Sequence, residues 1–99
     1  MERGGYVYII SNKNRTVLYT GVTSKLRNRI YEHRQGEGSI FTKKYNCTDL
    51  LYFEFFNDIE SAIKMEKQMK KWKREYKENV INRQNPDWLD LYETILDHN

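Results

Sequence analysis

The fold is decided by residues 19–33, which read YTGVTSKLRNRIYEH. The stretch begins with β-branched and aromatic residues that suit a half-buried strand. Gly21 follows at a point where a strand-to-helix corner needs a permissive backbone. Thr23 or Ser24 can then cap a helix by accepting a bond from a free backbone N–H. The stretch therefore predicts a strand, a tight glycine turn and a helix.

The predicted helix carries charge beside its apolar face. Leu26, Ile30 and His33 stand at i, i+4 and i+7, so they share one face, and Arg29 borders it. A cation and an imidazole are costly to bury unless an anionic group meets them. Two interpretations stay open: an arginine with a packed stem beside a hydrogen-bonded histidine, or a pair that faces an anionic ligand.

Length and composition bound the function classes. The chain has 99 residues, a formal net charge of +3 and a single cysteine, Cys47. These values predict one domain over residues 1–99, permit a polyanionic partner and exclude a disulfide framework or a cysteine-rich zinc site. The apolar run 6–10 is too short for a signal peptide or a membrane span. We expect a cytoplasmic protein with no membrane association.

Two further strands accompany the strand at 17–20. Residues 6–10 alternate in a strand-like pattern, and the polar residues 11–15 predict a hairpin that joins the two. The run 50–56 is almost continuously apolar, which predicts a strand in the middle of the sheet. The order strand, strand, helix, strand, helix predicts an α+β fold.

The last predicted strand leads into a long helix with one anomalous residue. Its apolar side is formed at helical spacing by Ile59, Ala62, Ile63, Met65, Met69, Trp72 and Tyr76. Glu66 lies inside this apolar arc, where a solvated glutamate is not expected. It is either paired with a core arginine or a metal ligand, because a magnesium site often needs only one or two carboxylates.

The C-terminal part contains a second capping signal. Asn85 followed by Pro86 predicts an N-cap and the first position of a helix that runs on through Ile95. Capping alone would explain Asn85, and a contact between its amide and a phosphate is the alternative.

Taken together, these motifs resemble a known family. The triplet Tyr6-Val7-Tyr8 is followed after ten residues by Tyr19-Thr20-Gly21, and then by Arg29, His33 and Glu66. This order resembles the GIY-YIG endonuclease superfamily, most closely its small stand-alone bacterial branch, which is similar to the N-terminal nuclease module of UvrC. The resemblance covers residues 4–88. Tyr6 replaces a glycine and Thr20 an isoleucine of the family triplets, and neither change removes a functional side chain.

The resemblance implies a three-stranded antiparallel sheet flanked by helices and the hydrolysis of DNA phosphodiester bonds with low sequence specificity, in repair or recombination. The implied catalytic residues are Tyr8, Tyr19, Arg29, His33 and Glu66. Glu66 would hold Mg²⁺ or Mn²⁺, Arg29 would neutralise charge on the phosphate, and Tyr8, helped by Tyr19 or His33, would act as general base.

Substrate contacts are expected from Gly21, Arg27, Lys43, Lys44 and Asn85. The DNA could be structured or single-stranded, and a protein partner could supply specificity that a chain of this length has no room for. The alternative is a non-catalytic nucleic-acid-binding module of the same fold, which would need neither Glu66 nor a metal. A purely structural interaction protein would leave Glu66 on an apolar face unexplained. The sequence does not fix the oligomeric state.

Overall fold

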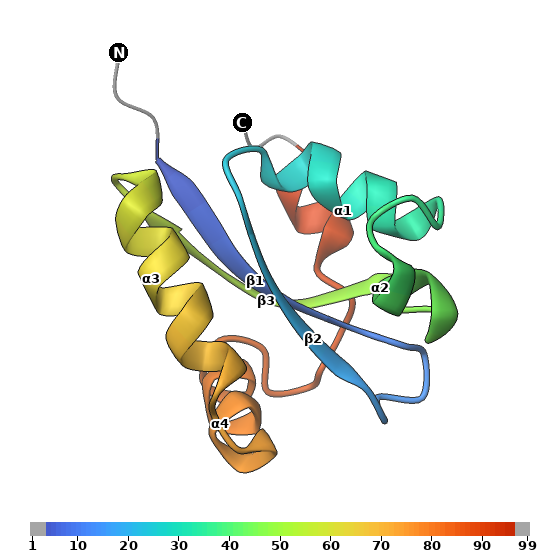
Figure 1. Cartoon of the computed structure of the whole chain (residues 1–99). Helices are drawn as coiled ribbons and strands as arrows, with labels where there is room; N and C mark the ends of the chain where they lie inside the picture. Colours follow the sequence, from blue (N-terminus) through green and yellow to red (C-terminus); the bar gives the residue numbers. More distant parts are fainter. Residues whose placement is uncertain (1–3, 97–99) are drawn as a thin grey trace.

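A three-stranded antiparallel sheet organises the chain in the computed structural model, which describes residues 4–96 (Figure 1). The elements in chain order are β1 (Gly5–Ser11), β2 (Leu18–Thr23), α1 (Leu26–Arg34), α2 (Ile40–Lys44), β3 (Asp49–Phe56), α3 (Ile59–Lys70), α4 (Arg74–Gln84) and the 3₁₀ helix η1 (Tyr92–Ile95). The predicted α+β class is confirmed. No helix within the described range has the length and apolarity that a bilayer crossing needs.

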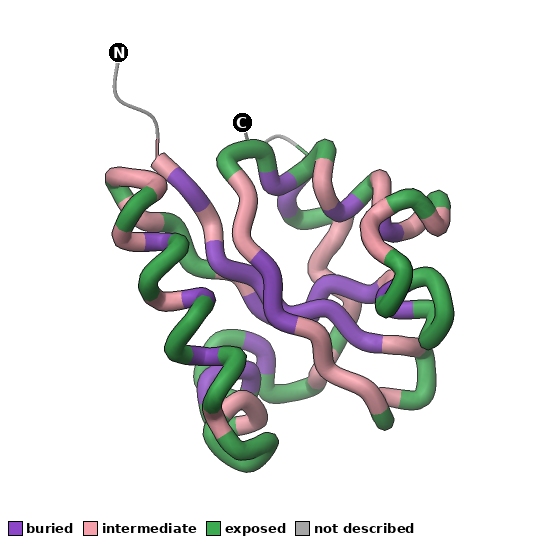
Figure 2. Tube along the Cα trace, in the orientation of Figure 1, coloured by how far each residue is buried: buried purple, intermediate pink, exposed green. Residues whose placement is uncertain are grey.

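β1 is the central strand, and β2 and β3 pair with it on either side. Its side chains alternate between the two sheet faces. Val7 and Ile9 pack in a cluster with α3 and α4, whereas Tyr8 and Ile10 pack in a cluster with α1 and η1. All four side chains are buried, so the sheet is covered on both faces (Figure 2).

β3 is an edge strand, so the prediction that its apolar run marks the middle of the sheet is wrong. Side chains close its outer edge in place of a fourth strand. The Gln84 amide accepts from the Phe53 N–H at 3.1 Å and donates to the Phe53 carbonyl at 2.8 Å. The Asn85 amide donates to the Leu51 carbonyl at 3.1 Å. These bonds occupy backbone groups that an open edge would offer to another chain.

The predicted long helix from residue 59 is two helices, with a break at residues 71–73. Lys73 takes an extended backbone conformation, with φ −64° and ψ 154°. The new direction lets α4 bury Val80 and Ile81 in the cluster that contains Leu51. This core contact stabilises the break, because buried apolar area outweighs the propensity of a polar segment to continue a helix.

The predicted helix after Pro86 is also not formed, and η1 is the helical part of that segment within the described residues. Asn85 is the C-cap of α4 instead of an N-cap. Its side chain accepts from the Leu89 N–H at 3.1 Å and donates to the Leu89 carbonyl at 2.7 Å. The Leu91 N–H donates to the Leu50 carbonyl at 2.7 Å. The segment therefore pairs with the edge of β3, and this pairing replaces the helix.

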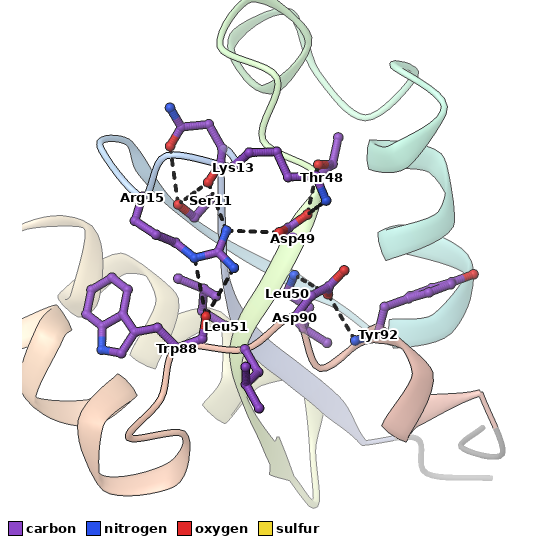
Figure 3. Close-up of polar contacts among 12 residues, drawn as sticks. Ser11, Lys13, Arg15, Thr48, Asp49, Leu50, Leu51, Trp88, Asp90 and Tyr92 are labelled. Carbon is purple, nitrogen blue, oxygen red and sulfur yellow. Dashed lines mark hydrogen bonds and ion pairs between the residues drawn. The ribbon is translucent and has the colours of Figure 1, made fainter.

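A buried carboxylate ties the β1–β2 hairpin to the C-terminal segment (Figure 3). Asp49 is 2% exposed and accepts from Lys13 Nζ at 2.7 Å and from Arg15 Nη1 at 2.9 Å. Arg15 also donates to the Trp88 carbonyl, at 3.1 Å and 3.3 Å. Burial alone would raise the pKa of Asp49, but bonds from Lys13, Arg15 and Thr48 outweigh burial and lower it. We call Lys13, Arg15, Asp49 and Trp88 the Asp49 clamp.

Candidate active site

Tyr8 and His33 form the centre of the candidate site. Tyr8 comes from β1 and His33 from the last turn of α1, and both side chains are buried. Tyr8 Oη lies 2.8 Å from His33 Nε2, and His33 Nδ1 lies 3.1 Å from Thr42 Oγ1. The predicted shared face of Leu26, Ile30 and His33 is confirmed, because these are the buried residues of α1.

Hydrogen-bond matching around Thr42 assigns the proton on His33. The Thr42 hydroxyl donates to the Ser39 carbonyl at 3.3 Å. We assign the His33 proton to Nδ1, which then donates to Thr42 Oγ1 and leaves Nε2 as the acceptor for the Tyr8 hydroxyl. In this assignment a continuous chain of bonds runs from Tyr8 through His33 and Thr42 to Ser39.

Burial keeps both central groups uncharged at neutral pH. It raises the pKa of Tyr8 to about 12, although the nearby Arg29 guanidinium lowers it. Burial, reinforced by the positive charge of Arg29, lowers the pKa of His33 to about 4. The site therefore holds a phenol that donates to a neutral imidazole, and the Nε2 lone pair that accepts this bond is where a proton from the phenol would go.

Arg29 is held beside this pair by two anchors. Its guanidinium donates to Glu32 Oε1 at 2.9 Å and to the Gly38 carbonyl at 2.9 Å. Burial alone would lower the pKa of Arg29, but its interactions with Glu32 and Tyr8 outweigh burial and raise it. Gly38 lies against His33 so closely that a Cβ at residue 38 would collide with the imidazole. The loop before α2 therefore positions both the cation and the imidazole.

Glu66 is buried on α3, as its place in the apolar arc predicts. Its partner is a lysine one turn further along the helix and not a core arginine: Lys70 Nζ lies 2.8 Å from Glu66 Oε2. The same ammonium lies 5.4 Å from the centre of the Tyr19 ring. Tyr19 in turn makes an edge contact with His33, with ring centroids 6.0 Å apart. Ring and charge contacts thus connect Glu66 to His33.

Gly21 has a different role from the one predicted. β2 continues through Gly21 to Thr23, so Gly21 is not at a corner but opposite Tyr8 in the sheet. A Cβ at residue 21 would collide with the Tyr8 phenol, so the missing side chain makes room for that ring. The capping prediction also changes: Lys25 is the N-cap of α1, and Thr23 Oγ1 accepts from the Lys25 N–H at 3.0 Å.

The structure thus gathers the five predicted catalytic side chains, because Tyr8 bonds to His33 beside Arg29, and Tyr19 contacts both His33 and the Lys70 partner of Glu66. In Figure 1, β2 runs between α1 and α3. The predicted substrate contacts are dispersed. Lys43 and Lys44 are exposed on α2, next to Thr42 in the chain. Arg27 donates to the Leu96 carbonyl at 2.6 Å, beside η1. Asn85 lies at the opposite sheet edge, with its amide bonded to backbone groups. These bonds give Asn85 a structural role, and its contact with a phosphate stays a prediction.

The side chains of the site fit a cation that takes most of its ligands from phosphate oxygens and water. Among residues 4–96, no three or more His, Cys, Asp or Glu side chains are grouped to hold a metal ion. Glu66 supplies one carboxylate, and its partner Lys70 has a side chain that is 47% exposed and can move into solvent. Mg²⁺ is often held by one or two carboxylates with water and phosphate oxygens completing its shell. Glu66 meets that requirement without a cage made of protein alone.

Three residues of the site, Lys70, Thr42 and Gly38, were not predicted from the sequence. Lys70 had a signal, because it stands four residues after Glu66 on the same helix. Thr42 and Gly38 had none, since their roles depend on how the loop after α1 folds back onto His33.

Comparisons with known proteins agree with this geometry. Residues 4–79 match the family model of the GIY-YIG catalytic domain. The chain is 39% identical over 77 residues to a UPF0213 protein of Clostridium perfringens, covering 78% of this chain and 82% of that protein. It is 35% identical over 75 residues to a UPF0213 protein of Haloquadratum walsbyi, covering 76% and 83%.

A solved structure extends the likeness to the whole chain. The solution NMR structure of a UPF0213 protein from Bacillus halodurans matches with a TM-score of 0.56 and 27% identity, covering 97% of this chain and 99% of that one. The matched residues 4–79 include every residue of the gathered site. The chain therefore belongs to the GIY-YIG family of nuclease domains and is similar to the UPF0213 proteins.

Proposed function

We propose that this protein is a metal-dependent endonuclease that hydrolyses DNA phosphodiester bonds with little sequence preference. The observation that carries the proposal is the 2.8 Å bond from Tyr8 to His33 beside the Arg29 guanidinium. Phosphodiester hydrolysis needs a group that takes a proton from water and a cation that stabilises the charge developing on phosphate. This pair and its arginine supply both.

In the proposed reaction, Tyr8 Oη accepts a proton from the attacking water while its own proton passes to His33 Nε2. The negative charge of the bound phosphate would offset the Arg29 charge that helps to lower the His33 pKa to about 4 in the free protein, so that the imidazole can take this proton. The resulting hydroxide bonds to phosphorus, the bond from phosphorus to the leaving oxygen breaks, and the leaving oxygen takes a proton from solvent. Arg29 donates to a non-bridging oxygen, whose negative charge grows in the transition state. Tyr8 needs this route because a phenol with a pKa of about 12 is not ionised at neutral pH.

Glu66 would hold a Mg²⁺ or Mn²⁺ ion, which when bound supplies Lewis-acid stabilisation of phosphate and leaving-group oxygens. Lys70 would leave Glu66 as the cation and phosphate enter. Its ammonium would then be free to contact a phosphate oxygen, since its side chain is half-exposed.

Substrate binding in this proposal is mainly electrostatic. The candidate phosphate contacts are Lys43, Lys44, Lys70 and Arg29, and contacts to phosphates carry no sequence information. Affinity should therefore fall steeply as salt rises and should differ little between sequences of one shape. A cytoplasmic role in repair or recombination, with a partner protein that supplies specificity, fits such a domain.

The test is Mg²⁺-dependent cleavage of supercoiled plasmid, branched DNA and single-stranded DNA by the parent protein, Glu66→Gln and Glu60→Gln. Glu60 is an exposed glutamate on the same helix, so its variant is a matched control for charge. We expect the parent and Glu60→Gln to cut and Glu66→Gln to be inactive. A parent that binds these substrates but cuts none with Mg²⁺ or Mn²⁺ would support the binding-module alternative.

A further inference from the structure

α2 exposes apolar side chains that its own packing does not require. Ile40 is 89% exposed, Phe41 44% and Tyr45, at the C-cap, 40%. The helix has five residues, and its buried member is Thr42, the partner of His33. A contiguous patch of exposed apolar side chains often marks a site that contacts a partner or a ligand.

The aromatic members form a row that starts at the candidate active site. The Tyr19 and Phe41 rings are stacked, with centroids 5.7 Å apart and planes 28° apart. The Phe41 and Tyr45 rings follow at 4.7 Å. We call Tyr19, Phe41 and Tyr45 the aromatic row. Its inner end contacts His33 through Tyr19, and its outer end at Tyr45 is open to solvent.

Lysines accompany the row at both ends. Lys70 Nζ lies 5.4 Å from the centre of the Tyr19 ring, and Lys44 Nζ lies 5.4 Å from the centre of the Tyr45 ring. Lys43 is exposed on the same short helix. Rings that can stack on bases, interleaved with cations that can meet phosphates, are the two components of sites that bind single-stranded nucleic acid.

We propose that the aromatic row is a stacking platform for unpaired nucleotides next to the cleaved phosphate, which makes single-stranded DNA, or a single-stranded segment of a structured DNA, the substrate class. That this DNA is cleaved rests on the proposed function, whereas its binding is argued from the aromatic row alone. Bases within a duplex have both faces covered by their neighbours, so they cannot stack on Phe41 or Tyr45 without leaving the helix.

Packing alone explains only part of the row. Phe41 on Tyr19 helps to fix α2 and with it Thr42. Tyr45 does not hold Thr42 in place in this way, because its ring contacts are with Phe41 and Lys44 at the surface. Tyr45 is therefore the residue at which a structural role and a binding role separate.

The test measures binding in EDTA, where no cleavage occurs, by fluorescence anisotropy of a labelled single strand and of the duplex of the same sequence. The variants are Tyr45→Ala and Phe41→Ala, and the matched control is Tyr76→Ala, a tyrosine on α4 that is 52% exposed. We expect the parent to prefer the single strand and Tyr45→Ala to lose about five-fold or more in affinity for it. Tyr76→Ala should leave both affinities unchanged.

Outcomes that overturn the platform are distinct from those that overturn the nuclease. Equal affinity for single strand and duplex, or equal loss of both in Tyr45→Ala, would reject the platform even if the parent cuts DNA. Dimerisation in sedimentation that disappears in Tyr45→Ala would reject it in favour of contact between two copies. A protein that binds single strands through Tyr45 but never cuts would keep the platform and reject the proposed catalysis. Because Phe41→Ala can also disturb α2, its circular dichroism is compared with that of Tyr45→Ala, which carries the decision.

Discussion

Gly21 of β2 is the register partner of Tyr8 of β1, and the Tyr8 phenol occupies the space that a side chain at residue 21 would take. The glycine thus acts through packing and not through a turn. The absence of a side chain at residue 21 lets the Tyr8 hydroxyl extend from β1 to His33 on α1.

Gly21→Ala should therefore displace the Tyr8 phenol. Overpacking of this kind costs about 1–3 kcal/mol of unfolding free energy, and cleavage should fall more than stability because the bond from Tyr8 to His33 is lost. Urea unfolding and the cleavage rate of the folded protein measure the two effects. Gly36→Ala is the control: it strains a backbone with φ +78°, but its Cβ would meet only Lys43 Cγ, at an ordinary contact distance of 3.9 Å, so it should lower stability and leave cleavage intact.

His33 predicts a specific loss of stability in acid. Its pKa is about 4 in the folded protein, below its ordinary value of 6.5, because burial and Arg29 disfavour the imidazolium. Between these values the unfolded chain binds more protons than the folded one, so stability rises with pH. The contribution is present above pH 6.5 and is lost as pH falls towards 4, by at most about 3 kcal/mol.

The measurement is urea unfolding of the parent and of His33→Asn at several pH values from 7 to 4.5. The variant should be less stable at pH 7 but should lose less on acidification. Parallel pH curves for the two proteins would mean that His33 is not held neutral.

Much of the sheet and the site could be predicted because the signals are local. Strand alternation placed Val7 and Ile9 on one face and Tyr8 on the other, and helical spacing placed Leu26, Ile30 and His33 together. The unusual burial of Glu66 was visible as a charge inside an apolar arc.

The errors concern long-range contacts. The run 50–56 reads as a central strand because nothing local shows that Gln84 will cover its edge. Asn85 reads as a helix start because Asn-Pro favours an N-cap, yet its amide is used by Leu51 and Leu89. In both cases a contact between residues more than thirty positions apart overrides the local preference.

Thr20 predicts a stabilising substitution. Its Oγ1 is buried with no hydrogen-bond partner among the described residues. A buried hydroxyl without a partner keeps its desolvation penalty, so Thr20→Val should raise the unfolding free energy by about 1 kcal/mol. Thermal unfolding measures this. The isosteric control is Thr48→Val, in which a hydroxyl that donates to Asp49 is lost, and it should be destabilised.

The Asp49 clamp should matter for stability and not for chemistry. Asp49→Asn removes two charge-assisted bonds from a buried site, at a cost of about 1–3 kcal/mol, limited by the exposure of Lys13. The clamp joins the hairpin, β3 and the C-terminal segment (Figure 3), and none of its four residues is a candidate catalytic residue. Cleavage by the folded variant should therefore equal that of the parent. Loss of cleavage at a temperature where the variant is folded would show that the clamp also shapes the site.

Substitutions at Glu66 and Arg29 distinguish a catalytic role of these residues from a structural ion pair between them. Glu66 bonds to Lys70, and Arg29 bonds to Glu32 and Gly38, so neither charge depends on the other for its partner. The stability losses of Glu66→Gln and Arg29→Ala should therefore add in the double variant, to within about 0.5 kcal/mol. Glu66→Gln alone should cost about 1 kcal/mol or less, since Lys70 is half-exposed.

Function should respond quite differently from folding. Glu66→Gln should abolish cleavage while DNA affinity stays equal or rises slightly, because a carboxylate that repels phosphate is gone. Arg29→Ala should mainly slow the chemical step, since its interaction strengthens as charge develops on the phosphate. Thermal midpoint, DNA affinity and cleavage rate of the parent, both single variants and the double variant decide the matter. If Glu66 and Arg29 formed a pair, each single change would strand a buried charge at about 3–5 kcal/mol, and the double variant would recover part of that loss.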